Sequence, residues 1–476
     1  MAPSDPSPDE APWEKLLRSV FGSDAAEAIE ELKARGMDVE ALNAAAGIAD
    51  NPALMDQVLS QVRSLLGAGN APVNSDVAHD IARQVAAGEG DPSITRSDVR
   101  AVSEALSVAD LWLDSATELP PAGGLRLAWS RSEWVERTLP AWNVLAAPIA
   151  ENLVAALTGV LREHLPDLDA MASDSDGIES RLAGILGAGD NAFDPTTIVT
   201  KLGSAVFGMQ VGQAAGTLSR DVFGLTDIGV PLLEERVSVL LPTNVAAFAE
   251  GLDTPADEVR LFLALREAAH ARLFTHVGWL RGHLLGLVDA YARGITIDTD
   301  ALESAISQID PTDPAAMQAA LSSGVFGIAA TEDQKATLAR LETSLALVEG
   351  WVDEVTTTAA LPHLPHTMAL REMIRRRRAA GGPAEQTFAS LVGLELRPRR
   401  SREAAALWSA IGSGLGTEGR DRVWDHPDLL PVALDLDDPA GFVRRRSETT
   451  EEQADVDRAI AELLADDDGT DRPVEG

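Results

Sequence analysis

Hydrophobic positions recur at helical spacing along most of this 476-residue chain. Turns rich in glycine and proline, such as the one at 119–124, separate the periodic segments. The pattern predicts helices at 12–35, 39–48, 51–67, 75–87, 96–117, 131–164, 277–293, 300–308, 314–322, 332–358, 365–379, 384–392, 401–413 and 452–465. We therefore expect a mainly α-helical fold.

One segment departs from the helical spacing. Residues 228–233 and 237–241 are apolar and flank a short polar turn, which is typical of two short strands or a small β hairpin. This segment comes shortly before a further predicted helix. Such a small sheet could hold an extended peptide along its edge, or it could simply cap the fold.

The helix after this segment begins at 253–257, where capping residues, a proline and acidic residues suit a helix N-terminus. It carries Arg266-Glu267-Ala268-Ala269-His270, which reads R-E-x-x-H. In the related motif H-E-x-x-H, two histidines four residues apart bind Zn²⁺, and the glutamate is the general base of a metallopeptidase.

Arg266 stands where that motif has its first histidine, and a guanidinium has no acceptor atom with which to ligate a cation. A zinc site would therefore need another protein ligand beside His270. His276 is one candidate by the spacing of a longer motif, although Leu273 replaces the glycine of that motif. Glu349 is the other candidate, with Asp353 on the same face of the predicted 332–358 helix.

The chain resembles the bacterial zincin-like metallopeptidase type 2 family, in particular a branch with R-E-x-x-H in place of H-E-x-x-H. LREAAHARLFTHVGWLR at 265–281 and LALVEGWVDEV at 345–355 carry the resemblance, which extends over residues 70–445. It implies a zincin-like architecture and zinc as a possible cofactor. It also implies Glu267 as the catalytic base, His270 and Glu349 as metal ligands, and a peptide or protein as substrate or partner.

The exchange at Arg266 leaves two functions open. One is a metallopeptidase homologue with a degenerate zinc site and weak or no activity, and the other is a non-catalytic binding or scaffold protein on the same fold. A fixed guanidinium could neutralise carboxylates that a metal would otherwise balance. We therefore expect Arg266 within salt-bridge distance of Glu349 or Asp353, and we expect Arg266→His to create metal affinity.

Four consecutive arginines, Arg375 to Arg378, end the helix predicted at 365–379, where cations suit the negative end of the helix dipole. Together with Arg371 they could bind an external carboxylate or phosphate. Because the chain has 75 acidic against 39 basic residues, pairing with its own acidic side chains is the favoured interpretation.

The formal net charge of −36 should repel nucleic acid and anionic membranes. The chain has no cysteine, which excludes disulfides and thiolate ligands and fits a cytoplasmic location. Its acidic, proline-rich start is unlike a secretory signal. No apolar run reaches the length of a membrane-spanning helix, which is about 20 residues. The apolar segment at 204–219 has glycines four residues apart, which predicts a closely packed buried helix.

The organisation expected from these patterns has four parts. Residues 1–11 form a disordered tail, 12–195 an N-terminal helical region, 196–446 the zincin-like region, and 447–476 a C-terminal helix with an acidic tail.

Overall fold

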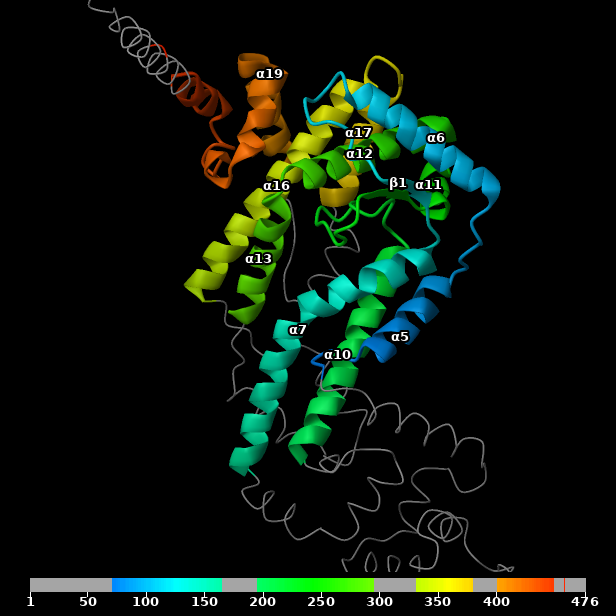
Figure 1. The fold of residues 1–476 in the computed structure, drawn as a ribbon, viewed down its shortest axis with the longest axis vertical. Coiled ribbons are helices and arrows are strands. Elements are labelled where there is room, and N and C mark those ends of the chain that lie inside the picture. The colour runs from blue at the N-terminus through cyan, green and yellow to red at the C-terminus, as the bar shows by residue number, and fades with distance from the viewer. Residues whose placement is uncertain (1–70, 165–194, 295–330, 380–399, 449–457, 459–476) are drawn as a thin grey trace, which may run out of the picture. The chain divides into compact units, whose positions relative to one another are not determined.

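The structure, a computed structural model, describes residues 71–164, 195–294, 331–379, 400–448 and 458. Within these ranges the chain is mainly helical and has one two-stranded sheet (Figure 1). The predicted fold class is therefore confirmed. Several expected features lie outside the described residues. They are the tail at 1–11, the helices expected before residue 71, those expected at 300–308, 314–322 and 384–392, and nearly all of the helix expected at 452–465.

The chain divides into two compact units. The first comprises residues 1–76, 150–207 and 297–327, and the second comprises 77–149, 208–296 and 328–476. All residues of the candidate site belong to the second unit. The domain boundaries expected at 195 and 446 stay predictions.

Most of the described helices follow the predicted pattern, but the pattern did not predict the helix at 242–249. Along the chain they are α5 (Ser75–Ala87), α6 (Arg96–Leu113), α7 (Arg131–His164), α10 (Pro195–Ser219), α11 (Pro242–Ala249), α12 (Ala256–His276), α13 (Leu280–Arg293), α16 (Glu332–Ala360), α17 (Thr367–Ala379) and α19 (Ser401–Asp421), followed by the short 3₁₀ turns η2 (Arg422–Asp425) and η3 (Pro427–Leu429). The helix expected at 401–413 continues to Asp421 through a kink at Gly416, whose φ of 77° suits glycine.

The small sheet lies before the motif helix, as expected, but its pairing differs from the predicted hairpin. Strand β2 (Val237–Leu240) pairs in parallel with β1 (Leu125–Ala128), with Leu125 opposite Val237. Residues 228–233 form no strand. Gly229 has a φ of 77° and Pro231 has no N–H to donate, so this segment is poorly suited to a ladder.

The other edge of β2 is also occupied. The backbone N–H of Leu241 donates to the carbonyl of Phe223 across 2.9 Å, and Gly224 forms an antiparallel bridge with Leu240. Since β1 covers the opposite edge, β2 offers no free edge to an extended peptide. Peptide binding along β2 is therefore not supported, and the two roles considered for the sheet stay predictions.

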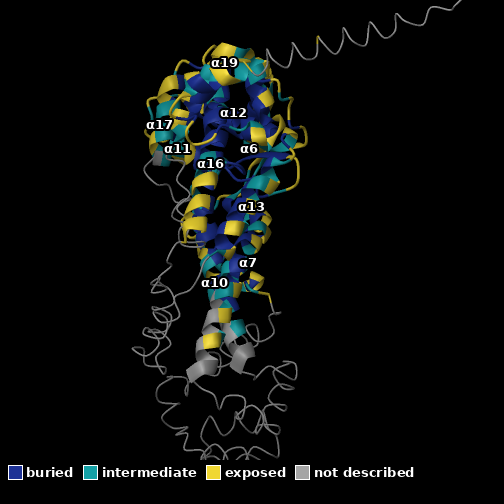
Figure 2. Ribbon diagram, turned by 90° about the vertical axis from the view of Figure 1, so that its left-hand side faces the viewer, coloured by how far each residue is buried: buried dark blue, intermediate teal, exposed yellow. Residues whose placement is uncertain are grey.

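Helix α12 runs through the core of the second unit and contacts α6, α11 and α16, while α16 packs against α19. Figure 2 shows α12 within the buried part of the fold. Charged side chains of α12 are buried with it, among them Arg272, which donates to the Leu119 carbonyl at 2.9 Å and to Asp114 at 2.8 Å. Buried charge is tolerated only when it is paired, so the partners of these side chains define what α12 does.

The segment 204–219 is packed closely, as its glycine spacing predicts. A Cβ at Gly212 would lie 2.5 Å from the Ala78 carbonyl oxygen, and one at Gly216 would lie 2.6 Å from the Cβ of Val85, both on α5. No helix in the described ranges is long and apolar enough to cross a bilayer.

Candidate functional site

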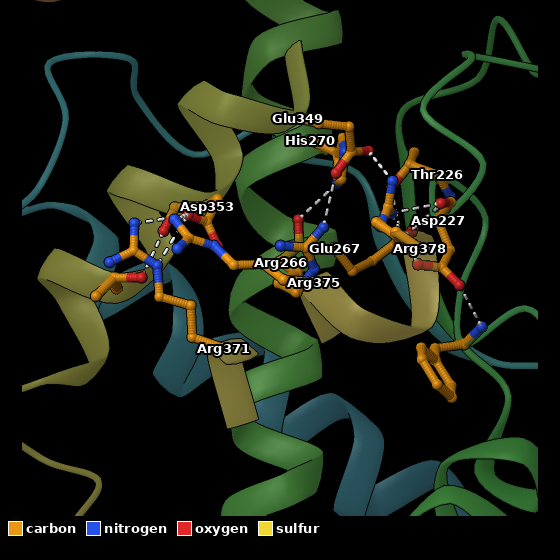
Figure 3. Close-up of polar contacts among 12 residues, drawn as sticks. Thr226, Asp227, Arg266, Glu267, His270, Glu349, Asp353, Arg371, Arg375 and Arg378 are labelled. Atoms are coloured by element: carbon orange, nitrogen blue, oxygen red, sulfur yellow. Dashed lines mark hydrogen bonds and ion pairs between the residues drawn. The ribbon is translucent and has the colours of Figure 1, made fainter. Parts of the chain in front are cut away.

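Arg266, His270 and Glu349 converge in the core between α12 and α16 (Figure 3). Nη2 of Arg266 donates to Oε2 of Glu349 at 2.9 Å, and Nε2 of His270 lies 3.1 Å from Oε1 of the same carboxylate. The exposed fractions of these side chains are 6%, 1% and 4%. The expected salt bridge from Arg266 to Glu349 is therefore present, and it is buried.

The imidazole of His270 faces an acceptor on each side. Its Nδ1 lies 2.9 Å from the carbonyl oxygen of Arg266, one turn earlier on α12, and its Nε2 faces the Glu349 carboxylate. A carbonyl and a carboxylate can only accept, so both contacts are hydrogen bonds only when both ring nitrogens carry protons. In that state His270 has no lone pair with which to ligate a metal.

A second guanidinium, from Arg378 on α17, completes the surroundings of Glu349. Its Nη1 lies 2.7 Å from Oε1 of Glu349, and its Nη2 donates to the carbonyl oxygen of Asp227 at 2.7 Å. The arginine run is visible in the sequence, but nothing there places Arg378 at the motif. The run itself is the available signal, because so many cations in an acidic chain must find internal partners.

The electrostatics of this cluster favour ion pairs. Burial by itself would raise the pKa of Glu349, but Arg378, His270 and Arg266 together hold the pKa of this carboxyl well below its usual range. For Arg378, burial opposes the charge, yet Glu349 and Asp227 raise the pKa of its guanidinium. Both partners are thus charged, which a buried pair needs if the cost of desolvation is to be offset.

Asp353 lies one turn after Glu349 on α16 but has different partners. Its Oδ2 accepts from Nε and Nη2 of Arg371 at 2.8 and 2.6 Å, and from Nη2 of Arg375 at 2.6 Å. The sequence offers it as an alternative partner of Arg266. The structure places it instead in an ion cluster between α16 and α17.

Glu267 points away from His270 and towards the small sheet. Its Oε1 accepts from the backbone N–H groups of Val239 at 3.1 Å and Leu225 at 3.3 Å. Its Oε2 accepts from the N–H of Thr226 at 3.1 Å and from the hydroxyl of Thr226 at 2.6 Å. A Cβ at Gly224 would lie 2.5 Å from Oε2, so the loop approaches this closely because residue 224 is a glycine.

Burial raises the pKa of Glu267, while the hydroxyl of Thr226 and the N–H groups of Val239 and Thr226 act in the opposite direction. The carboxylate joins α12 to β2 and to the loop before it. Action as a general base would require some of these four hydrogen bonds to break first.

His276 lies outside the cluster. It is exposed at the end of α12, and its Nε2 lies 3.3 Å from the Pro121 carbonyl oxygen. Six residues beyond His270 on the same helix correspond to about 9 Å along the axis and about 240° of rotation. The placement therefore does not support His276 as the additional ligand that its spacing suggested.

The space left at the motif is small. A cavity of about 10 Å³ is lined by Phe223, Gly224, Asp227, Leu240, Leu263, Arg266, Glu267 and His270. This volume is at the lower limit for one water molecule. Within the described ranges, no group of three or more histidine and carboxylate side chains could hold a metal ion.

The residues at this site do not fit a catalytic zinc ion. Such an ion needs about three protein ligands and an open position for water. Here His270 and Glu349 contact each other, and two guanidinium groups, from Arg266 and Arg378, lie against the same carboxylate. A divalent cation would have to displace these positive charges or share the pocket with them.

A helical core in which an E-x-x-H helix faces a glutamate from a later helix is the arrangement expected of a zincin-like protein. The chain matches the model of the zincin-like metallopeptidase family over residues 73–443, and it belongs to that family. This confirms the family inferred from the segments at 265–281 and 345–355. No protein of curated function matches the chain.

Among solved structures, the fold is similar to that of a protein from Chloroflexus aurantiacus described as a candidate hydrolase with a novel fold. The similarity covers 79% of this chain and 99% of that one, with 18% sequence identity and a TM-score of 0.52. At this level of identity the likeness concerns the fold alone.

Proposed function

We propose that this chain is a zincin-like protein with a degenerate zinc site and weak or no peptidase activity. The observation that carries the proposal is the set of partners of Glu349. One of its oxygens faces Arg378 and His270, and the other accepts from Arg266. The carboxylate that would serve as a metal ligand is fully engaged with cations of the protein itself.

Energetics support this proposal. Breaking one partner out of a buried ion pair costs about 3–5 kcal/mol, because the remaining charge is left without compensation. A zinc ion that displaced both arginines would have to offset this cost for Arg266, and in addition the loss of the ion pair between Glu349 and Arg378, which would keep Asp227 as a partner. After both displacements, His270 and Glu349 would be the two protein ligands at this site, whereas a tight zinc site has three or four.

The charged residues of the motif instead act as connections between elements. Arg266 joins α12 to α16, and Arg378 joins α17 to both α16 and the loop at Asp227. Glu267 joins α12 to β2. In this proposal the charged groups of the R-E-x-x-H sequence hold the fold together.

A binding or scaffold role is the second candidate function. It is favoured by a cavity of about 230 Å³ on another side of α12, beside Phe274. Arg266 and Arg378 do not line this cavity. The charge of −36 and the lack of cysteine support a cytoplasmic location and a partner that is neither nucleic acid nor an anionic membrane.

Elemental analysis of protein purified without a metal-affinity tag tests the proposal. We expect far less than one zinc per chain, and no hydrolysis of casein or of a fluorogenic peptide library with or without added Zn²⁺. Stoichiometric zinc that is lost in Glu349→Ala and kept in Glu354→Ala, a matched change on the same helix, would overturn it. Peptide hydrolysis that Glu267→Gln abolishes without unfolding the protein would do the same.

A further inference from the structure

Helix α12 borders two cavities of very different size. The motif residues border the cavity of about 10 Å³, whereas Ala271, Phe274 and Thr275 border one of about 230 Å³. The larger cavity, here called the 231–237 cavity after the loop that forms most of its wall, has the volume of about eight water molecules in the liquid. We propose that it binds a free apolar α-amino acid as a zwitterion.

The walls of the 231–237 cavity can accept an apolar side chain. Leu225, Pro231, Leu232 and Phe274 line it together with the aliphatic part of α12. Its volume suits a group the size of a leucine or phenylalanine side chain rather than a folded partner. Burial of such a group is favourable, which gives the apolar part of the ligand its share of the affinity.

The charged groups at this cavity can accept the two ends of a zwitterion. Nη1 of Arg281 lies 3.2 Å from Oε1 of Glu234, and their side chains are 35% and 82% exposed. An ion pair this exposed is weak and can be opened at little cost. Arg281 would then form a forked contact with the ligand carboxylate, and Glu234 would accept from its ammonium group.

The charges of the cavity wall favour a zwitterion over a simple ion. Arg236 and Glu235 also line the cavity, so the formal charges of its four charged side chains sum to zero. A ligand with one charge would meet a like charge there, while a zwitterion finds a partner for each of its ends.

The 231–237 cavity lies next to the motif without depending on it. The Phe274 ring is 6.0 Å from that of His270, and Thr226, another lining residue, donates to Glu267. Filling the cavity leaves the contacts of Glu349 with Arg266 and Arg378 in place. The inference rests on the binding role proposed above, and it is independent of metal content and peptidase activity.

Calorimetric titration of the full chain with L-leucine, L-phenylalanine and the dipeptide Leu-Leu tests the proposal. We expect saturable binding at one site by at least one of these zwitterions. Leucinamide, which lacks the carboxylate, and N-acetyl-leucine, which lacks the ammonium group, should each bind about tenfold or more weakly. Leu-Leu, whose ammonium and carboxylate groups are on different residues, should bind more weakly than leucine, and tighter binding of Leu-Leu would overturn the assignment to a free amino acid.

Variants of residues that line the cavity test where the ligand binds. Arg281→Ala should weaken binding by about tenfold or more, and Thr275→Trp should abolish it by filling the cavity. Arg293→Ala is the matched control, because Arg293 lies on the same helix and pairs with exposed Asp289 outside the cavity. A thermal melt without ligand verifies that each variant is folded, and Arg281→Lys, which keeps the charge but not the fork, replaces Arg281→Ala if the latter does not fold.

The proposal is overturned if no zwitterion binds saturably to the wild type, if both single-charge analogues bind as well as leucine, or if the Arg281 variant binds like the wild type. Any of these results would leave the proposal of a degenerate zinc site with weak or no peptidase activity untouched. A failure of that assignment would instead appear in the elemental analysis.

Discussion

The guanidinium of Arg266 and the carboxylate of Glu349 meet across 2.9 Å in the buried space between α12 and α16. By the resemblance to zincin-like metallopeptidases, these are the two positions that we propose a metal would join if Arg266 were the histidine of H-E-x-x-H. Here the positive charge is part of the chain and is always present, because a guanidinium does not lose its proton in a protein. The connection between the two helices therefore needs no cofactor.

The first prediction concerns the stability that Glu349 provides. Glu349→Gln removes the negative charge, which leaves Arg266 buried without compensation and Arg378 with Asp227 as its remaining acidic partner. We expect the free energy of unfolding to fall by about 3–5 kcal/mol, which is typical for a broken buried ion pair. Urea unfolding at pH 7, followed by circular dichroism, measures the loss.

Glu372→Gln on α17 is the control for this measurement. Glu372 also contacts two arginines, Arg376 at 2.9 Å and Arg402 at 3.1 Å, but this cluster lies at the surface. Solvent screens it, so the same chemical change should alter stability far less. Equal losses of stability in the two variants would show that burial does not make the ion pairs of Glu349 more stabilising than those of Glu372.

The second prediction concerns acid. The folded-state pKa of Glu349 is below its unfolded value of 4.5. A group of this kind stabilises the fold fully above the unfolded pKa, and the contribution is lost as the pH falls towards the folded pKa. The stability gap between the wild type and Glu349→Gln should therefore be widest near neutral pH and should narrow below pH 4.5. Unfolding curves of both proteins from pH 7 downwards check this, and a gap that widens in acid would contradict it.

The third prediction separates a structural Glu267 from a catalytic one. In Glu267→Gln, the new amide would place N–H donors against the backbone N–H groups of Val239 or Thr226. Each buried donor left without an acceptor costs about 1–3 kcal/mol, so the variant should be clearly less stable than the wild type. Asp257→Asn, at the exposed start of the same helix, should change stability little. An unchanged or raised stability of Glu267→Gln would show that these hydrogen bonds do not hold the loop.

The helices were predictable because their signals are local. Periodicity gave the bounds of α7, and a capping box of Thr331 and Gln334 marks the start of α16 one residue before Glu332. The meeting of Arg266 with Glu349 was also predictable, because carboxylates in a core without a metal must find a cation. Helix faces and charge balance are properties that a sequence displays directly.

Tertiary partners were not predictable in the same way. The partner of β2 is β1, four residues that follow a glycine turn more than a hundred positions earlier, and nothing local connects them. Arg378 lies at the end of a charge run of a kind that usually faces solvent, and only the packing of α17 brings it to Glu349. The sequence places Glu267 on the same helix as His270, but it could not show that three backbone N–H groups lie within hydrogen-bond distance of the Glu267 carboxylate.

The last prediction asks whether the cleft can be returned to metal binding. Arg266→His completes H-E-x-x-H, and by sequence reasoning this change is sufficient to create metal affinity. The structure adds an obstacle, because Arg378 still lies 2.7 Å from Oε1 of Glu349 and competes with a metal for it. We therefore expect Zn²⁺ to raise the melting temperature of Arg266→His only slightly, and that of Arg266→His with Arg378→Gln distinctly. At a free zinc concentration of 100 times the dissociation constant, the gain would be about 2.7 kcal/mol.

Arg266→His combined with Arg377→Gln is the matched control, because Arg377 is the neighbour of Arg378 in the arginine run but pairs with Asp221. This variant should respond to zinc no more than Arg266→His alone, and the wild type should not respond at all. If zinc stabilises the Arg378 and Arg377 combinations equally, Arg378 does not control access to Glu349. If zinc stabilises neither, positions 266, 270 and 349 do not form a ligand set, and the assignment of Glu349 to a former metal site is wrong.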